Sequence, residues 1–130
     1  MDDCVKELKL TANLGQSFIV REMNFKDPKM IERVISTSNV VINLIGPKQR
    51  YYDKTDFEWT NIEIPRRIAA ACRKNPNIIR MVQFSAAGAE ENSEALDWQT
   101  KWLGEQAVLN EFPNATILRP CTVIFLLKFF

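Results

Sequence analysis

The chain has 130 residues, 46% hydrophobic and 25% charged, which predicts a single domain over residues 1–130. Seventeen Lys and Arg against sixteen Asp and Glu give a formal net charge of +1, so nothing points to nucleic acid or to an anionic membrane. Histidine is absent, which removes the commonest transition-metal ligand, and we expect no metal site. The three cysteines are far apart and odd in number, as in the reduced thiols of an intracellular protein.

The first half of the chain alternates between a β-rich and a helical pattern. Residues 16–25 predict a strand, and Asp27 then predicts a helix N-cap with Pro28 in the first helical position. Residues 39–46, NVVINLIG, form a short apolar run that ends on glycine. Such a run predicts a strand buried on both faces, as in parallel sheets under helices, and completes one βαβ step.

The second half repeats this alternation. Asp56 is a candidate N-cap for a helix over residues 57–75, in which Pro65 costs about 3 kcal/mol unless the helix kinks or restarts there. The pattern then predicts a strand, a helix and a last strand, over residues 77–85, 93–112 and 115–120. Short apolar strands separated by helices indicate an α/β sheet with right-handed crossovers. We see no apolar run long enough to span a membrane and no targeting signal at the start of the chain.

Ligands of parallel sheets bind beyond the carboxyl ends of the strands. In this chain those ends fall at Ile45 and Gly46, at Ser85 and at Pro120. Each position has a plainer interpretation, because Gly46 and Pro120 are also ordinary strand terminators and Ser85 is ordinary turn chemistry. A basic cluster on the second helix also has two interpretations. It either contacts a phosphate group or keeps the outer face of the helix in water. Its members are Arg66, Arg67, Arg73 and Lys74.

Five stretches in this order carry a resemblance to a known family: ANLGQ, VVINLIG, QFSAAG, LGEQAV and FPNATILRP. Together they resemble the Rossmann-like accessory subunits of mitochondrial respiratory complex I, over roughly residues 4–120. That family belongs to the atypical extended short-chain dehydrogenase/reductase superfamily, and its members hold a tightly bound NADPH without turning it over. The resemblance implies a location on the matrix side of the inner membrane. It also implies complex I subunits of the matrix arm, and of its junction with the membrane arm, as partners.

The chain departs from this family at the phosphate-binding turn. Members begin with a strand and a Gly-x-x-Gly-x-x-Gly turn, whose bare backbone lets a pyrophosphate approach a helix N-terminus. The four glycines here, Gly15, Gly46, Gly88 and Gly104, form no such turn. We therefore expect a partial Rossmann-like doubly wound parallel sheet, truncated at both ends and lacking the first βαβ unit. In the usual strand order this leaves a hole in the sheet, which another polypeptide, a rearrangement or a surrounding assembly would have to fill.

A second departure concerns catalysis. Carbonyl-reducing members of the superfamily place a tyrosine four residues before a lysine, and the lysine lowers the pKa of the phenol so that it donates a proton. Lys101 matches that lysine, but Asp97 stands where the tyrosine is expected. An ionised carboxylate cannot serve as that acid, so we predict no catalytic residue. The plainer interpretation of Lys101 is a solvated lysine, or one stacked on Trp98 or Trp102.

The resemblance thus implies a non-catalytic structural accessory subunit of complex I with a degenerate NADPH site. In that site Lys101 would reach the nicotinamide ribose, and the cofactor would lie over Asn43, Leu44, Ile45, Gly46, Ser85, Lys101 and Pro120. The missing glycine turn argues against retention of NADPH. The alternative is a fragment of a soluble extended short-chain dehydrogenase/reductase or epimerase, against which Asp97 argues. The apolar segment 121–130, CTVIFLLKFF, is expected to lie against a neighbouring subunit or, as a misassigned terminus, to be disordered.

Overall fold

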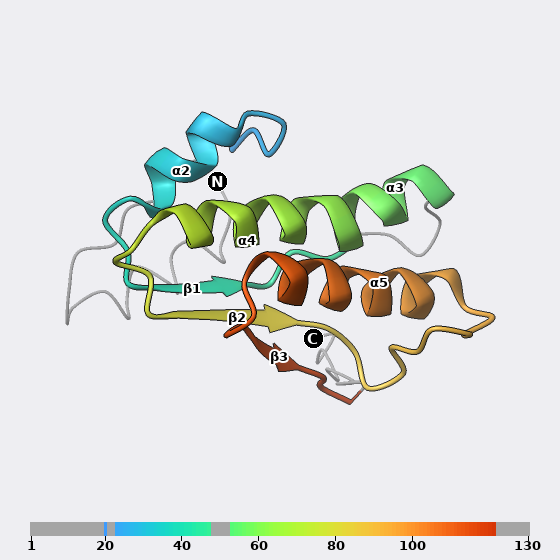
Figure 1. The fold of residues 1–130 in the computed structure, drawn as a ribbon. Helices are drawn as coiled ribbons and strands as arrows, with labels where there is room; N and C mark the ends of the chain where they lie inside the picture. Colours follow the sequence, from blue (N-terminus) through green and yellow to red (C-terminus); the bar gives the residue numbers. More distant parts are fainter. Residues whose placement is uncertain (1–19, 21–22, 48–52, 122–130) are drawn as a thin grey trace, which may run out of the picture.

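The computed structural model describes residues 20, 23–47 and 53–121. Its strands form one parallel sheet in the order β1-β2-β3, made of β1 (Val40–Asn43), β2 (Arg80–Phe84) and β3 (Thr116–Leu118). Three helices form a single layer over one face of this sheet (Figure 1): α2 (Pro28–Ile35), α4 (Ile64–Lys74) and α5 (Leu96–Glu111). The predicted α/β class with a parallel sheet and crossover helices is confirmed.

Helix α2 begins as its sequence predicts. The side chain of Asp27 caps the helix by accepting a hydrogen bond from the backbone N–H of Lys29 at 3.0 Å. Pro28 occupies the first helical position, where a missing N–H costs nothing. Ile31 and Ile35, one turn apart, are buried against the rest of the helical layer.

The long second helix starts earlier than predicted and is broken. Asp53, and not Asp56, caps α3 (Lys54–Glu58), so the prediction of Asp56 as the cap is wrong. The Asp53 carboxylate accepts a hydrogen bond from the Asp56 N–H at 2.9 Å, which leaves Asp56 in the first turn, where the helix dipole favours an acid. A π-helical segment, η2 (Trp59–Glu63), follows, and α4 restarts with Pro65 in its first turn, as the proline predicts.

Strand β1 is present but is not buried on both faces, so that prediction is wrong. Asn43 is buried on the helical side and Val41 packs against the core, whereas Val40 and Ile42 remain 46% and 58% exposed. The reason is that the helices of the described part all cover the same face of the sheet. The strand predicted over 16–25 lies largely outside the described residues, and its described positions 20 and 23–25 are not in a strand.

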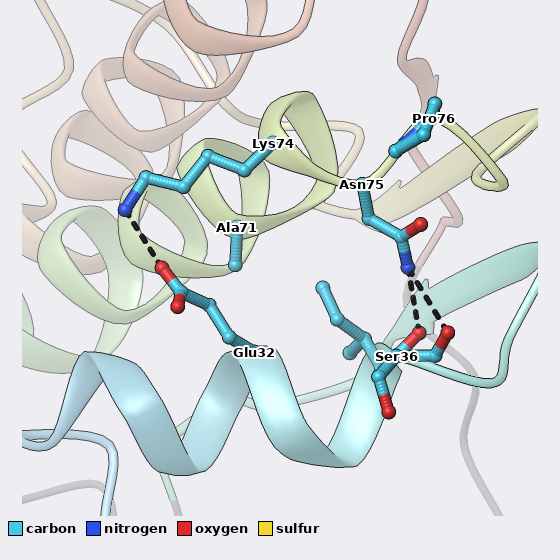
Figure 2. A pocket seen from close by; sticks show the side chains of 7 residues that line it. Glu32, Ser36, Ala71, Lys74, Asn75 and Pro76 are labelled. Carbon is cyan, nitrogen blue, oxygen red and sulfur yellow. Dashed lines mark hydrogen bonds and ion pairs between the residues drawn. The ribbon is translucent and has the colours of Figure 1, made fainter.

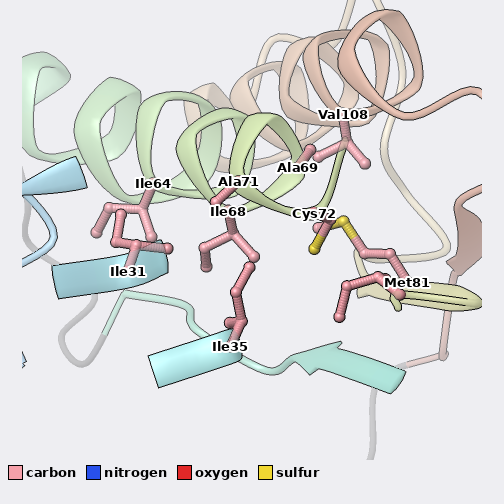
Figure 3. Packing of buried hydrophobic residues seen from close by; sticks show 10 residues of the cluster. Ile31, Ile35, Ile64, Ile68, Ala69, Ala71, Cys72, Met81 and Val108 are labelled. Carbon is pink, nitrogen blue, oxygen red and sulfur yellow. The ribbon is translucent and has the colours of Figure 1, made fainter. Parts of the chain in front are cut away.

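The core lies between the helical layer and β2 (Figure 3). Its most completely buried members come from three helices and one strand: Ile31, Ala69, Cys72, Met81 and Val108. Helix α5 approaches η2 closely because Gly104 has no side chain, and a Cβ there would overlap the backbone carbonyl of Asn61. The buried carboxylate of Glu105 then ties α5 to the end of β3 by accepting a hydrogen bond from Arg119 Nε at 2.9 Å. This partner raises the pKa of Arg119, so the guanidinium stays charged.

Candidate functional site

A hollow of about 300 Å³ opens where β2 and β3 end beside the first turn of α5. Its wall is held together across the sheet by two backbone hydrogen bonds. The Ser85 N–H donates to the Leu118 carbonyl at 2.8 Å, and the Ala87 N–H donates to the Pro120 carbonyl at 3.0 Å. The lining comprises Ser85, Ala86, Ala87, Gly88, Asp97, Trp98, Lys101, Pro120 and Cys121.

The charged side of the hollow is a chain of three side chains. Lys101 Nζ lies 2.9 Å from Asp97 Oδ2, one helical turn away, and both side chains are about two-thirds or more buried. Asn61 reaches across from η2 and donates from Nδ2 to Asp97 Oδ1 at 3.0 Å. The same amide group donates to Thr100 Oγ1 at 2.9 Å, which fixes its orientation. The carboxylate therefore has a hydrogen-bond donor on each oxygen and is held as an acceptor.

The opposite side of the hollow is apolar, with one unpaired hydroxyl. Trp98 packs on Gly88, and a Cβ at Gly88 would come within 2.8 Å of the indole ring. Ser85 Oγ is buried and has no hydrogen-bond partner among the described residues. A buried hydroxyl without a partner costs about 1–3 kcal/mol, so this position favours a polar group entering the hollow.

The structure brings together three of the seven predicted cofactor-binding residues. Ser85, Lys101 and Pro120 line the hollow, whereas Asn43, Leu44, Ile45 and Gly46 are absent from its lining. The side chain of Asn43 already has hydrogen-bond partners within the fold, because its Nδ2 donates to Gln83 Oε1 at 2.8 Å and its Oδ1 accepts from the Ile45 N–H. Leu44 is 69% exposed, and a Cβ at Gly46 would meet open space.

Two residues that shape the hollow were missed at the level of sequence. Asn61 interrupts an apolar stripe at helical spacing, Phe57, Asn61, Ile64 and Ile68, and an amide on such a stripe requires a buried partner. Gly104 lies between Thr100 and Val108 at intervals of four residues, so it falls on the inner face of α5. Both patterns are visible in the sequence. They indicate that Asn61 and Gly104 are buried, but they do not show which residues these two contact.

Comparison with known proteins assigns the family. The profile described as "NAD dependent epimerase/dehydratase family" matches residues 4–124. The chain belongs to this family. In accord with this, UDP-glucuronic acid 4-epimerase from Bacillus cereus, solved with NAD, superposes with a TM-score of 0.70 at 18% identity, over 91% of this chain and 42% of that one. A dTDP-4-dehydrorhamnose reductase from Bacillus anthracis, solved with NADP, gives 0.68 at 14% identity, over 89% and 49%. The fold is thus Rossmann-like, as predicted.

Two curated proteins that are similar in sequence carry the same name. The Arabidopsis thaliana protein "NADH dehydrogenase [ubiquinone] 1 alpha subcomplex subunit 9, mitochondrial" is 36% identical over 95% of this chain. The rat protein of the same name is 38% identical over 87% of this chain. The chain spans 30% and 29% of the lengths of these two relatives.

The hollow can be tested against the dinucleotide that the two solved relatives hold. Its polar groups fit the hydroxyls of a ribose, since Lys101 donates, Asp97 accepts and the Ser85 hydroxyl is unpaired. They do not fit the two phosphates, which need free backbone N–H groups. In the loop after β2, the N–H groups of Ser85 and Ala87 are already bonded to the end of β3. The hollow thus offers a lysine, a carboxylate and an unpaired hydroxyl, while the N–H groups of Ser85 and Ala87 have partners.

The basic cluster on α4 is neutralised within the fold. Arg66 and Arg67 contact the Glu63 carboxylate at 2.8 and 2.7 Å, and Arg73 contacts Glu111 at 3.0 Å. The hydrogen bond from Arg66, supported by Arg67, lowers the pKa of Glu63 and keeps its carboxylate charged. The arrangement favours the interpretation of a solvated, ion-paired helix face over that of a phosphate site.

A second hollow, of about 230 Å³, lies between the ends of α2 and α4 (Figure 2). Lys74 spans it to reach Glu32 at 2.7 Å, and Asn75 Nδ2 donates to the Ile35 carbonyl at 3.0 Å. Its polar groups already have partners, so it has less to offer a ligand than the hollow around Lys101. Across residues 20, 23–47 and 53–121 there is no cluster of possible metal ligands, and none of the helices could cross a membrane.

Proposed function

We propose that this chain is a non-catalytic structural accessory subunit of mitochondrial NADH:ubiquinone oxidoreductase, complex I. The support comes from the relatives named above, which are 36% and 38% identical over most of the chain. Its partners would be other complex I subunits of the matrix arm and of its junction with the membrane arm, on the matrix side of the inner membrane. The whole assembly transfers electrons, and this chain contributes to its architecture.

The observation that carries the non-catalytic role is the Asp97–Lys101 pair at 2.9 Å. The superfamily's reductases need a phenol at position 97 that donates a proton, with the lysine lowering its pKa. Here the lysine is held by a carboxylate, which accepts hydrogen bonds from Asn61 and Lys101. With no histidine in the 130 residues, the usual alternative proton donor is also missing.

An NADPH contact made by the described residues would lie at the ribose end. Bound NADPH supplies a hydride donor; the part of this chain is to bind and orient the nicotinamide ribose. Lys101 and Asp97 would pair with the ribose hydroxyls, and Ser85 would satisfy its own buried oxygen there. Charge-assisted hydrogen bonds to the phosphates contribute about 1.5–3 kcal/mol each, so two or three of them change affinity by several powers of ten.

The second candidate is a fragment of a soluble epimerase or reductase. Its support is the fold, with the TM-score of 0.70 to the Bacillus cereus epimerase. A fold carries no activity by itself, and the site decides between the two candidates. Asp97 at the place of the proton donor favours the structural subunit.

Assembly is the direct test of this proposal. The chain, carrying an affinity tag, is expressed in the cells of its source, and mitochondrial membranes are resolved by native electrophoresis. We expect the tag to migrate with complex I activity and to co-purify with matrix-arm subunits. A tag found entirely as free soluble monomer would contradict the proposed role.

Activity is tested separately on the purified chain. NADPH oxidation is followed with 4-keto sugars as acceptors, and epimerisation of UDP-sugars in the presence of NAD is followed by chromatography, for the unaltered chain, Lys101→Ala and Lys54→Ala. Lys54 is the matched control, because it forms an exposed pair with Glu58 one turn away on α3. We expect no turnover in any of the three proteins. Turnover that is lost in Lys101→Ala and kept in Lys54→Ala would favour the enzyme instead.

A further inference from the structure

The four charged residues of α5 all turn toward the fold. Asp97 pairs with Lys101 at 2.9 Å, the buried Glu105 binds the guanidinium at the end of β3, and Glu111 pairs with two arginines of α4. By contrast, the two charged residues that end α4 have 61% and 63% of their side-chain surface exposed. Helix α5 therefore reverses the usual arrangement, in which a surface helix turns its charges outward.

The outward side of α5 carries no charge. Gln99, Trp102, Leu103, Gln106 and Asn110 share this side, because they recur at intervals of three and four residues. Leu103 is 40% exposed, Gln106 and Asn110 are exposed, and Trp102 is half-buried. We call these five residues the uncharged face. The centres of protein–protein interfaces are depleted of charge and enriched in Trp, so the uncharged face has the composition of an interface.

The uncharged face borders a hollow on η2. Gly104 brings α5 so close to η2 that a Cβ at this glycine would lie 3.6 Å from the Cα of Ile62. Ile62 is half-buried and lines a hollow of about 390 Å³. The other residues that line it are Thr55, Glu58, Trp59 and Glu63. A partner that lies on the uncharged face therefore has a concave surface at the margin of its contact.

One end of the uncharged face is acidic. Glu90, Glu91 and Glu94 lie in the loop before α5, are exposed, and form no ion pair with any residue that the structure describes. Gln99 holds this loop against the face by donating from Nε2 to the Glu91 carbonyl at 3.3 Å. Helix α3 begins at the same end of the helical layer (Figure 1), and its first turn adds the exposed Asp56. The N-terminal end of the uncharged face thus carries a surplus of negative charge.

We propose, on the basis of the function proposed above, that the uncharged face docks a helix of a neighbouring complex I subunit. The partner helix presents an apolar, uncharged stripe to Trp102 and Leu103, along the roughly 17 Å that eleven residue steps of α5 span. One end of the partner carries Lys or Arg, which pair with Glu90, Glu91 and Glu94. Because cations favour a helix C-terminus, that end is the partner's C-terminal one, and the two helices run antiparallel.

The charges on this side of the molecule argue against two other occupants. A second copy of this chain, packed antiparallel, would bring the end of α4 to the acidic loop. Its arginines are already neutralised by Glu63 and Glu111. A bilayer that contains anionic lipids attracts basic residues and repels an acidic end. A helix with free Lys or Arg side chains is the occupant that the acidic end favours.

Assembly of the tagged 130-residue chain tests this proposal. Leu103→Asp places a charge in the uncharged face, and Val34→Asp on α2 is the matched control, because the two residues are 40% and 37% exposed. We expect Val34→Asp to migrate with complex I as the unaltered chain does. Leu103→Asp should reduce the assembled share at least about tenfold, because docking would bury an unpaired charge. Circular dichroism of the purified variants checks the fold.

Equal assembly of the two variants overturns the docking of α5 while leaving the proposed function in place. Absence of the unaltered chain from complex I overturns the proposed function, and the docking of α5 with it. The two failures are therefore distinguishable.

Photo-cross-linking identifies the occupant without disturbing the core. A genetically encoded benzophenone side chain is placed at position 106, and at position 33 of α2 as the control, since both positions are exposed. We expect position 106 to cross-link to a helix of another complex I subunit that ends in Lys or Arg. Changing Glu90, Glu91 and Glu94 to Lys should lower the yield several-fold.

Four results of the cross-linking overturn the proposal. They are a product with a second copy of the chain, a product with lipid, a product with residues 122–130, which lie outside the described residues, and a yield no higher than at position 33. A yield that the three Lys substitutions leave unchanged removes the charge complementarity and overturns it as well.

Discussion

The two faces of one sheet differ in what covers them. On the helical side Met81 is fully buried, and Cys72 and Val108 pack in the same cluster. On the opposite face Ile42, one position from the core-facing Val41, is 58% exposed. Both faces of the strands carry apolar residues in the sequence. The sequence pattern therefore shows that these residues favour burial, but it does not show which face is buried. Which face is buried depends on the path of the helices, and that path is set by the handedness of the connections.

The largest contrast between the faces is expected at Met81. Met81→Ala removes a fully buried side chain between the helices and β2 and should lower the free energy of unfolding by about 2–5 kcal/mol. Ile79→Ala, two residues away and 74% exposed, should change it by less than about 0.5 kcal/mol. Urea unfolding followed by circular dichroism measures both. Similar losses in the two variants would show that the helical face is not the core.

The next largest effect is expected at two glycines, one packed inside the helical layer and one in open space at the end of β1. Gly104→Ala forces a Cβ into the backbone of Asn61 and should cost about 1–3 kcal/mol by pushing α5 away from η2. Gly46→Ala, at the end of β1, meets open space with no positive φ and should be neutral or stabilising by about 0.4–1 kcal/mol. Thermal unfolding of the two variants separates them. A neutral Gly104→Ala would mean that the two helices pack less closely than described.

The smallest effect is a pH dependence from the helical face. Burial raises the pKa of the Cys72 thiol from 9.0 to about 11, so the folded state keeps its proton where the unfolded state loses it. The stability that this thiol contributes is present below pH 9 and is lost as the pH rises toward 11, by about 1 kcal/mol per pH unit.

This dependence is measured by urea unfolding between pH 8 and pH 10.5. Cys72→Ala should lose stability less steeply over that range than the unaltered chain. The exposed Cys121 supplies the matched control, because Cys121→Ala should leave the slope unchanged. Equal slopes in all three proteins would contradict the burial of the Cys72 thiol against the helical layer.

The sequence predicted the parts of the fold that local chemistry decides. The Asp27 cap, the restart at Pro65 and the parallel strands followed from short-range patterns, and the structure confirms them. The cap at Asp56 was wrong because Asp53 offers the same carboxylate one turn earlier, and the N–H groups of the first turn reach either one. The exposure of Val40 and Ile42 on β1 could not be foreseen, since it depends on where the helices elsewhere in the chain lie.

For the candidate site, the sequence placed three residues at one edge and could not show how they pair. Strand ends predicted Ser85 and Pro120 together, because parallel strands end at the same edge. The hydrogen bond from Asn61 to Asp97 links residues 36 positions apart, which no local pattern reveals. The structural role of Asn43 could not be predicted for the same reason, because its hydrogen-bond partner Gln83 lies on the neighbouring strand.

The bonds from Ser85 and Ala87 to the end of β3 have a consequence for the dynamics of the hollow. β3 has three residues and pairs with β2 alone among the described strands, and it is also held by the Arg119–Glu105 pair and by Ile117, which packs against the core. Detachment of β3 is a local opening, which requires less free energy than global unfolding. The wall that carries Pro120 would leave with it, while the Asp97–Lys101 pair on α5 would remain. Loss of the hollow by this route therefore requires breaking the Arg119–Glu105 pair as well as the ladder between β2 and β3.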